Sequence, residues 1–193
     1  MSDDKKDGKL EFNNAYKGLF HFLWTDKRIP KQINTLLETV HPSNLLEFGC
    51  GLGYFLEFVE NNGVKATGID FSSVAIEKAK KRLDKNTNKP ILLEGDVTNL
   101  QFDDNQYDCI LDIGCFHSLD GNDEKKYIIE AHRVLKPNGT LLIWSLKKSF
   151  ADNVKINPEH IKNISKENFV LEKAEFTRRR LAGSYWYWLK KFV

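Results

Sequence analysis

Short apolar segments alternate with amphipathic ones along most of this chain. Apolar runs with the length of a buried strand lie at 44–48, 66–69, 91–94, 107–113 and 140–146. Between and around them, apolar residues recur at helical spacing at 26–40, 54–61, 72–83, 123–135 and 158–166. Strands that alternate with helices in this way predict a parallel sheet with helices on both faces and right-handed crossovers.

The last two apolar segments break this alternation. Residues 168–176 and 184–192 are typical of strands, and the residues that join them leave no room for a helix, so the two strands should pair antiparallel. The expected fold is α/β: a Rossmann-like, mostly parallel seven-stranded sheet with helices on both faces and an antiparallel C-terminal hairpin at its edge. We find neither an internal repeat nor an interior linker, which predicts one domain over 1–193.

The start of the chain differs from the rest in composition. Residues 1–9 are charged and polar, without the apolar core of a signal peptide, and are expected to form a disordered tail. Residues 10–40 should form an N-terminal cap segment and a helix. This segment is rich in aromatic residues, and Tyr16 and Trp24 are the candidates for a lid over a site. The alternative is that these aromatics only anchor the leading helix to the core.

Charge and cysteine content exclude several classes of function. The chain has 29 basic and 27 acidic residues spread along its length, which gives no strong electrostatic reason to bind nucleic acid or an anionic membrane. No apolar stretch approaches the roughly 18 residues that span a bilayer. The three cysteines, Cys50, Cys109 and Cys115, form no Cys-x-x-Cys pair, which favours a reducing cytoplasm over a disulfide scaffold or a zinc site.

A glycine turn follows the first predicted strand and opens a helix, the position of a nucleotide-binding turn. Its glycines are Gly49, Gly51 and Gly53, whereas the dinucleotide fingerprint needs a glycine at the position of Tyr54. Glu47 precedes the turn by two residues. A carboxylate there suits a ligand with an ammonium and a sulfonium and would repel a pyrophosphate. The alternative is that Glu47 hydrogen-bonds a neighbouring loop.

Two further acidic motifs follow the next two predicted strands. Asp70 lies 21 residues after Gly49, near the offset at which an acid reaches ribose hydroxyls, although it could equally be a helix N-terminal acid. Phe71 could cover a purine or belong to the core. Asp96 could accept a hydrogen bond from an exocyclic amino group, and Val97 could donate its backbone N–H. In register, these motifs place three strand ends around one ligand.

Together these motifs resemble those of class I S-adenosylmethionine-dependent methyltransferases. The resemblance covers 44–146 strongly, and it rests on the glycine turn, Gly68-Ile69-Asp70-Phe71, Gly95-Asp96-Val97, Phe102-x-x-x-x-Tyr107-Asp108 and Leu135-Lys136-Pro137-Asn138-Gly139-Thr140. The family typically has a second glycine where Asn138 stands. The segment 112–119 resembles bacterial small-molecule enzymes of the thiol, thiopurine, halide and tellurite type. It lacks the Asn/Asp-Pro-Pro-aromatic motif of enzymes that methylate nucleic-acid amino groups.

The resemblance implies S-adenosylmethionine as the cofactor and assigns residues to its parts. The cofactor-binding residues it implies are Glu47, Gly49, Cys50, Gly51, Gly53, Asp70, Phe71, Asp96, Val97 and Asp112. Asp112 would lie near the methionine amino group and the sulfonium. Cys115 and Phe116 would flank the methionine end and the acceptor, although methyl transfer needs no covalent enzyme intermediate and Cys115 could simply pack.

His117 is the candidate general base, because imidazole titrates near neutrality; the alternative is a loop histidine that shapes the pocket. The expected reaction is methyl transfer to a small-molecule acceptor, without a metal, by a cytoplasmic monomer or homodimer. The alternatives are a methyltransferase acting on protein or RNA, a protein that binds the cofactor without transferring the methyl group, and a nicotinamide-dependent oxidoreductase.

Overall fold

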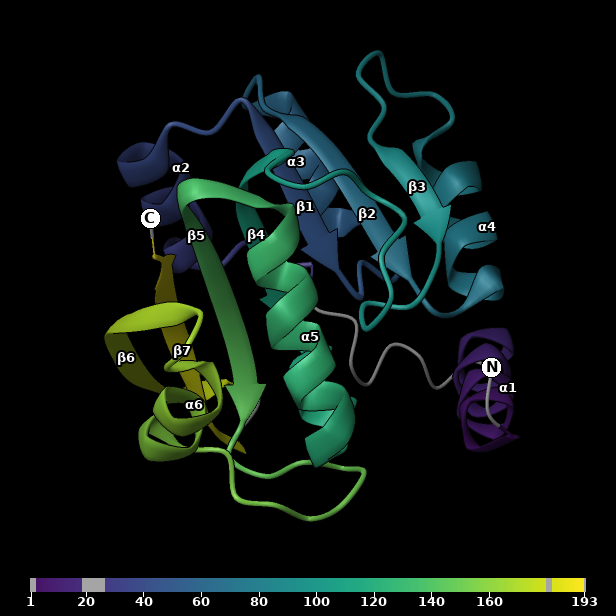
Figure 1. The fold of residues 1–193 in the computed structure, drawn as a ribbon. Coiled ribbons are helices and arrows are strands. Elements are labelled where there is room, and N and C mark those ends of the chain that lie inside the picture. Colours follow the sequence, from purple (N-terminus) through teal and green to yellow (C-terminus); the bar gives the residue numbers. More distant parts are fainter. Residues whose placement is uncertain (1–2, 19–26, 180–181, 193) are drawn as a thin grey trace.

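The computed structural model describes residues 3–18, 27–179 and 182–192. Their strands form a single seven-stranded sheet with the order β3-β2-β1-β4-β5-β7-β6 (Figure 1). The strands are β1 (Asn44–Phe48), β2 (Lys65–Asp70), β3 (Ile91–Glu94), β4 (Tyr107–Ile113), β5 (Leu135–Leu146), β6 (Phe169–Arg179) and β7 (Ala182–Lys191). The predicted α/β, Rossmann-like fold is confirmed.

Helices cover both faces of the sheet. The helices are α1 (Asp3–Lys17), α2 (Lys31–Val40), α3 (Tyr54–Asn61), α4 (Ser73–Leu83), α5 (Gly121–Val134) and α6 (Pro158–Ser165), with a short 3₁₀ turn, η2 (Phe116–Ser118). Alternation along the strands divides the core in two, because successive strand side chains point to opposite faces. Leu46 and Ile110 face α5 and α6, whereas Leu45 and Cys109 face α2, α3 and α4.

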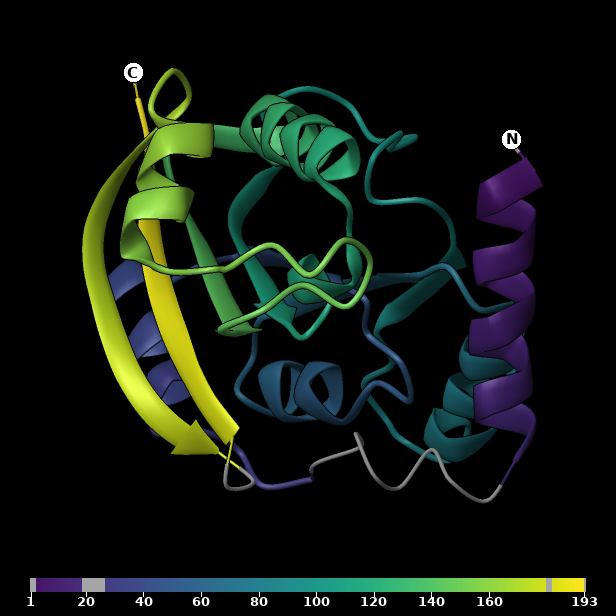
Figure 2. The same ribbon diagram turned by 90° about the horizontal axis from the view of Figure 1, so that it is seen from below.

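The strand order reverses between β1 and β4. From β1 the chain proceeds outward through β2 and β3 on one side, and it later returns to β4 and β5 on the other. In open sheets of this kind, ligands bind at the carboxyl ends of the strands where the order reverses. The segments that follow β1, β2, β3 and β4 all emerge at this end, which Figure 2 shows from below.

The C-terminal hairpin adds its second strand, β7, next to β5 and its first strand, β6, at the edge of the sheet. β7 pairs antiparallel with β5, with Leu142 opposite Trp188, and β6 pairs antiparallel with β7 on the outside. The one antiparallel strand is therefore β7, and it lies inside the sheet instead of at the edge. Trp186 and Trp188 consequently enter the buried layer beneath α2.

The N-terminal expectation needs correction. Residues 3–9, predicted to be part of a disordered tail, lie in α1. The helix is held against the start of α4, where the side-chain oxygen of Asn13 accepts a hydrogen bond from the Ser72 hydroxyl at 2.7 Å. In both views α1 stands beside α4, below the carboxyl ends of β2 and β3 (Figures 1 and 2).

Among the described residues, no helix combines the length and the apolar character needed to cross a bilayer.

Candidate functional site

The glycine turn after β1 has a backbone that side chains other than glycine adopt with difficulty. Gly49, Gly51 and Gly53 have φ values of 64°, 52° and 72°. This is the left-handed region, where a Cβ is strained. The turn is tied to β2, because the Gly51 N–H donates to the carboxylate of Asp70 at 2.8 Å. It is also tied to itself, through a 2.8 Å bond from the Gly53 N–H to the Cys50 carbonyl.

Neighbouring side chains close on this turn from two directions. A Cβ on Gly49 would lie 2.7 Å from the Cβ of Cys115, in the loop after β4. A Cβ on Gly51 would lie 2.7 Å from the hydroxyl of Tyr16, in α1. The structure thus brings the lid candidate Tyr16 to the glycine turn. The other lid candidate, Trp24, lies outside the described residues.

Glu47 is a buried carboxylate at the end of β1. It is 2% exposed, and among the described residues its Oε2 has no hydrogen-bond partner. Burial raises the pKa of Glu47 well above its usual value, and Asp112 and Asp70 raise it further by repulsion. A buried oxygen of this kind is costly to leave unpaired, so it favours a ligand that brings a hydrogen-bond donor or a positive charge.

Asp70, at the end of β2, is also buried. One of its oxygens accepts the Gly51 N–H, and the other accepts the Ser72 N–H at 2.8 Å. Burial raises the pKa of Asp70 to about 6, against the effect of these two bonds. Each oxygen keeps a second lone pair, so the carboxylate can still accept hydrogen bonds from hydroxyl groups.

Asp112, at the end of β4, is engaged by its own loop. One oxygen accepts the N–H groups of Gly114 at 3.0 Å and Cys115 at 2.9 Å. The other accepts the Phe116 N–H at 3.0 Å and the Tyr127 hydroxyl at 2.8 Å. Burial raises the pKa of Asp112 to about 7. By accepting these four bonds, Asp112 holds the loop after β4 in place. Its effect on a cation in the site would be electrostatic attraction.

The loop after β3 places Asp96 and Val97 next to β2. One oxygen of Asp96 accepts the N–H and the hydroxyl of Thr98, at 2.9 Å and 2.7 Å. Val97 is buried in the layer beneath α5. On the other side, the ammonium of Lys9 lies 5.8 Å from the centre of the Phe71 ring and also pairs with Glu94. The helix α1 thus reaches both the β2 and the β3 ends of the site.

Phe116 lies in the core of this structure. Its ring is fully buried and meets the ring of Tyr127 edge-on at 5.3 Å, in the layer under α5. Its backbone N–H donates to Asp112. The contact of Phe116 with an acceptor stays a prediction. Cys115 is half-buried and contacts the glycine turn.

His117 is buried in an aromatic setting. Its ring lies edge-on to the rings of Trp144 at 5.8 Å and Phe150 at 4.9 Å. Its Nδ1 accepts the Leu146 N–H at 3.4 Å, which places the proton of the neutral ring on Nε2. Burial lowers the pKa of His117 to about 4. A ring whose accepting nitrogen is already bonded is poorly suited to act as a base, so the geometry favours the packing interpretation.

Arg82 supports the turn and was not identified from the sequence. From the last turn of α4 it donates to the carbonyls of Leu52 at 2.9 Å and Gly53 at 2.8 Å. Its guanidinium also lies 4.1 Å from the centre of the Tyr54 ring. No motif spacing connects residue 82 with residue 53; the only signal is a basic residue at the C-terminal end of a predicted helix.

The segments that form the strand ends described above match a known protein family. The chain matches the methyltransferase domain family over residues 46–143. It is 32% identical over 114 residues to phosphoethanolamine N-methyltransferase of Plasmodium falciparum, covering 58% of this chain and 42% of that protein. It is 31% identical over 130 residues to ribosomal RNA-processing protein 8 of Arabidopsis thaliana, covering 67% of this chain and 38% of that protein. The chain thus spans less than half the length of each of these relatives.

Among solved structures, the fold is similar to that of 1,6-didemethyltoxoflavin-N1-methyltransferase of Burkholderia thailandensis. The TM-score is 0.82 at 16% identity, and the match covers 100% of this chain and 92% of the other. That protein was solved with 1,6-didemethyltoxoflavin and S-adenosylhomocysteine bound. The family match runs from β1 into β5 and takes in the glycine turn and the three acidic strand ends. The chain therefore belongs to the methyltransferase domain family, as its resemblance to class I S-adenosylmethionine-dependent enzymes predicts.

Proposed function

We propose that the chain binds S-adenosylmethionine at the glycine turn and transfers the methyl group to a small-molecule acceptor. The observation that carries this proposal is the unpartnered, buried Oε2 of Glu47 beside the glycine turn. Burial raises the pKa of Glu47, and the neighbouring Asp112 and Asp70 raise it further by repulsion, so the three carboxylates form an acidic cradle. A cradle of this charge suits a cationic ligand and opposes a pyrophosphate, which sets the nicotinamide alternative aside.

The residues present fit the parts of the cofactor. Glu47 would accept from the amino group of the methionine moiety, and Asp70 would accept from the ribose hydroxyls. Asp96 and Val97 would lie at the adenine, and Phe71 would cover one of its faces. The glycines let Cys115 and Tyr16 pack directly against the turn, where a Cβ on Gly49 or Gly51 would collide with them. When bound, the cofactor supplies a methyl group on a positively charged sulfur, which is already activated for displacement.

The chain's own task is then to align the acceptor and to exclude water. Positioning the acceptor nucleophile in line with the S–CH₃ bond is worth about 7–11 kcal/mol in well-oriented systems. Tyr16 closes over Gly51 on one side. The segment after β5 crosses the carboxyl end of the sheet on another side (Figure 2).

This partial enclosure favours a small acceptor over RNA or protein. Tyr16 is 8% exposed, so α1 already covers part of the strand-end region. Of the three similar proteins described above, two are named for small molecules, phosphoethanolamine and 1,6-didemethyltoxoflavin, and one is named for ribosomal RNA processing. Arg178 begins the one run of three arginines, which lies partly outside the described residues. We infer that the protein acts as a monomer or homodimer and that it acts in the cytoplasm.

Calorimetric titration with S-adenosylmethionine and with NAD tests the cofactor. Binding of the first and not of the second is expected, and binding of NAD alone would overturn the proposal. A screen of thiols, phenols, amines and inorganic anions with an isotopically labelled methyl donor then tests the acceptor. Label transferred to bulk RNA or protein but to no small acceptor would support the alternative substrate classes instead.

A further inference from the structure

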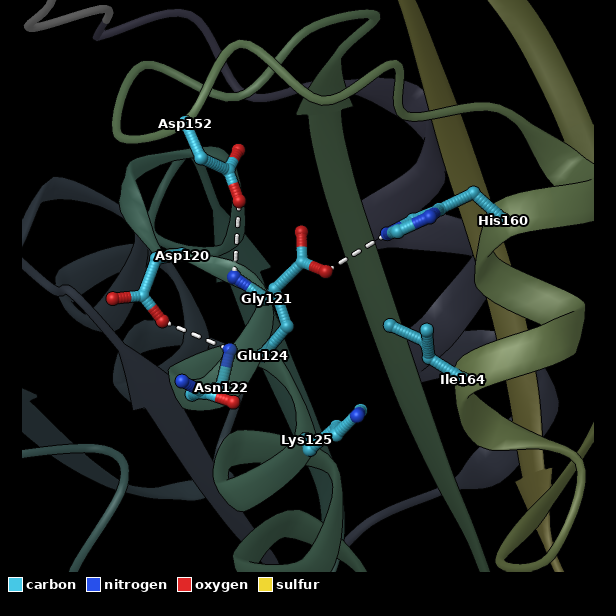
Figure 3. A pocket seen from close by; sticks show the side chains of 8 residues that line it. All are labelled: Asp120, Gly121, Asn122, Glu124, Lys125, Asp152, His160 and Ile164. Carbon is cyan, nitrogen blue, oxygen red and sulfur yellow. Dashed lines mark hydrogen bonds and ion pairs between the residues drawn. The ribbon is translucent and has the colours of Figure 1, made fainter.

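An open surface cavity of about 500 Å³ lies away from the glycine turn, between α5 and α6. The start of α5 supplies Gly121 and Glu124, and α6 supplies His160 and Ile164. The segment between β5 and α6 contributes Asp152. Figure 3 shows these side chains converging on one space from three parts of the chain. Nothing in the proposed methyl transfer uses this group of residues.

Glu124 forms the buried wall of this cavity. It is 1% exposed, and its Oε2 lies 2.8 Å from Nε2 of His160. Its other oxygen, Oε1, is also buried and has no hydrogen-bond partner among the described residues. In Figure 3 the carboxylate projects into the space between Asp152 and His160. A buried carboxylate oxygen without a donor is costly, so it favours a ligand that carries one.

The other acidic groups at the cavity are already held in place. Asp152 accepts the Gly121 N–H at 3.0 Å, and Asp120 accepts the Asn122 N–H at 2.9 Å. The N–H groups that could attract an anion to the start of α5 are thus occupied by carboxylates of the chain. Lys125 and His160 are the basic side chains in the lining. Three carboxylates therefore face one lysine and one histidine, which favours a cation.

We propose that this cavity binds the ammonium group of a small organic molecule, with Glu124 as its buried counter-charge. An ammonium has three donors, which match Oε1 of Glu124 and the remaining lone pairs of Asp152. A divalent metal fits less well, because among the described residues no three His, Cys, Asp or Glu side chains are grouped so that they could hold a metal ion. This inference does not depend on the cofactor or on methyl transfer.

The pKa of His160 should change when an ammonium binds beside Glu124. The hydrogen bond to Glu124 raises the pKa of His160, and the charge of Glu124 and Asp152 adds to this effect. A cation beside Glu124 would compete with the imidazolium for the same carboxylate. By linkage, ammonium binding lowers the pKa of His160, and binding weakens as pH falls through that pKa. Asp120, Asp152 and Lys125 are the other charged groups lining the cavity.

The experiment is an NMR titration of the His160 ring protons in the full chain with ethylammonium. Tetramethylammonium, which has no N–H donor, and sodium at equal ionic strength are the reference ions. The proposal expects saturable shifts and a lower His160 pKa with ethylammonium, and at least about tenfold weaker effects with the reference ions. Equal responses to all three ions would show charge screening only and would overturn it, as would no saturable response.

Variants locate the site. Glu124→Gln should weaken ethylammonium binding by at least about tenfold, since it removes the buried charge. Asp152→Asn lies at an exposed position and keeps one of the two oxygens that accept the N–H groups of Gly121 and Val154. It should weaken binding by a few fold, which keeps the test valid if Glu124→Gln folds poorly. Glu159→Gln, an exposed acid on α6 outside the cavity lining, is the matched control and should leave binding unchanged. Unchanged binding in both test variants would refute the assignment.

Discussion

The hydroxyl of Tyr16 occupies the space next to Gly51 that a side chain there would need, with 2.7 Å between the oxygen and the position of a Cβ. A helix near the start of the chain therefore closes directly onto the turn that follows β1. The same helix is pinned to the end of β2 through Asn13 and Ser72. The helix α1 and the glycine turn form one packed unit, and changes on either side should affect both.

Gly51→Ala should weaken binding of S-adenosylmethionine by at least about tenfold, since the new methyl group is strained at this φ and clashes with Tyr16. Tyr16→Phe in the same chain should restore part of the loss, because it removes the clashing oxygen. Calorimetric titration measures both effects. Gly63→Ala is the matched control, because its φ is 81° but nothing lies within 4 Å of its Cβ position. Identical losses at Gly51 and Gly63 would contradict the steric argument.

Asn13→Ala should release α1 from the site. The substitution removes the acceptor for the Ser72 hydroxyl, a loss of about 1 kcal/mol for a hydrogen bond of this kind. Hydrogen exchange in residues 3–17 should become several-fold faster, while exchange in β1 and β4 stays unchanged. Asn14→Ala, at an exposed position of the same helix, serves as the control. Equal exchange in both variants would mean that α1 is held by other contacts.

Glu47→Gln should reduce the affinity for S-adenosylmethionine by at least about tenfold, because it removes the buried negative charge that faces the cationic ligand. The free energy of unfolding of the ligand-free protein should not fall, since burial already raises the pKa of Glu47 and disfavours its charge. Calorimetry and urea denaturation give the two quantities. Glu77→Gln on the exposed side of α4 should change neither. A destabilised variant with normal affinity would assign Glu47 a structural role.

The pH dependence of binding has a definite sign. Burial raises the pKa of Asp70 to about 6 and that of Asp112 to about 7. Their contribution to the stability of the ligand-free protein is complete below their unfolded pKa values and is lost as pH rises through these folded values. A cationic ligand favours the ionised forms, so its affinity should rise between about pH 5 and pH 8 with release of protons. Titrations in buffers of different ionisation heat measure this release, and a flat affinity would refute the acidic cradle.

His117→Asn should leave the affinity for S-adenosylmethionine unchanged, because the asparagine oxygen can take over the bond from the Leu146 N–H. His117→Ala should cost about 1–3 kcal/mol of stability through the unpaired N–H and the lost ring contacts. For any acceptor found in the screen, the rate between about pH 6 and pH 9 should not follow a histidine titration, since burial lowers the pKa of His117 to about 4. A rate that falls with a pKa near neutrality in the wild type, and not in His117→Asn, would restore the base role.

Hydrophobic periodicity predicted the bounds of several helices and strands correctly. β1, β3, β4 and α3 have the predicted bounds. Each is a short apolar run or a periodic segment between turn residues, so periodicity suffices. β5 begins five residues earlier than predicted, at Leu135 instead of position 140, because the Pro137-Asn138-Gly139 segment continues the strand as an irregularity opposite β4. In the sequence, a proline followed by an asparagine and a glycine indicates the end of an element. Only the pairing with β4 shows that the strand continues through them.

Contacts between distant segments could not be predicted in the same way. The sequence places Glu47, Asp70 and Asp96 at three neighbouring strand ends, because parallel topology brings such ends together. It gives no signal that Asn13 bonds Ser72 or that Arg82 bonds the Gly53 carbonyl. Each bond joins two segments that are far apart in sequence, and no hydrophobic periodicity or motif spacing links them. Nor does the sequence distinguish Asp112 facing a ligand from Asp112 holding its own loop, because both require the same residue at the same place.

The place of β7 inside the sheet has a consequence for how the chain folds. β6 is made before β7, yet its position at the edge depends on β7 filling the gap beside β5. During synthesis, β5 must therefore wait with an open hydrogen-bonding edge, and β6 must wait without a neighbouring strand. Unpaired strand edges of this kind invite association with other chains. The final residues of the hairpin thus decide when the nascent protein ceases to be prone to aggregation.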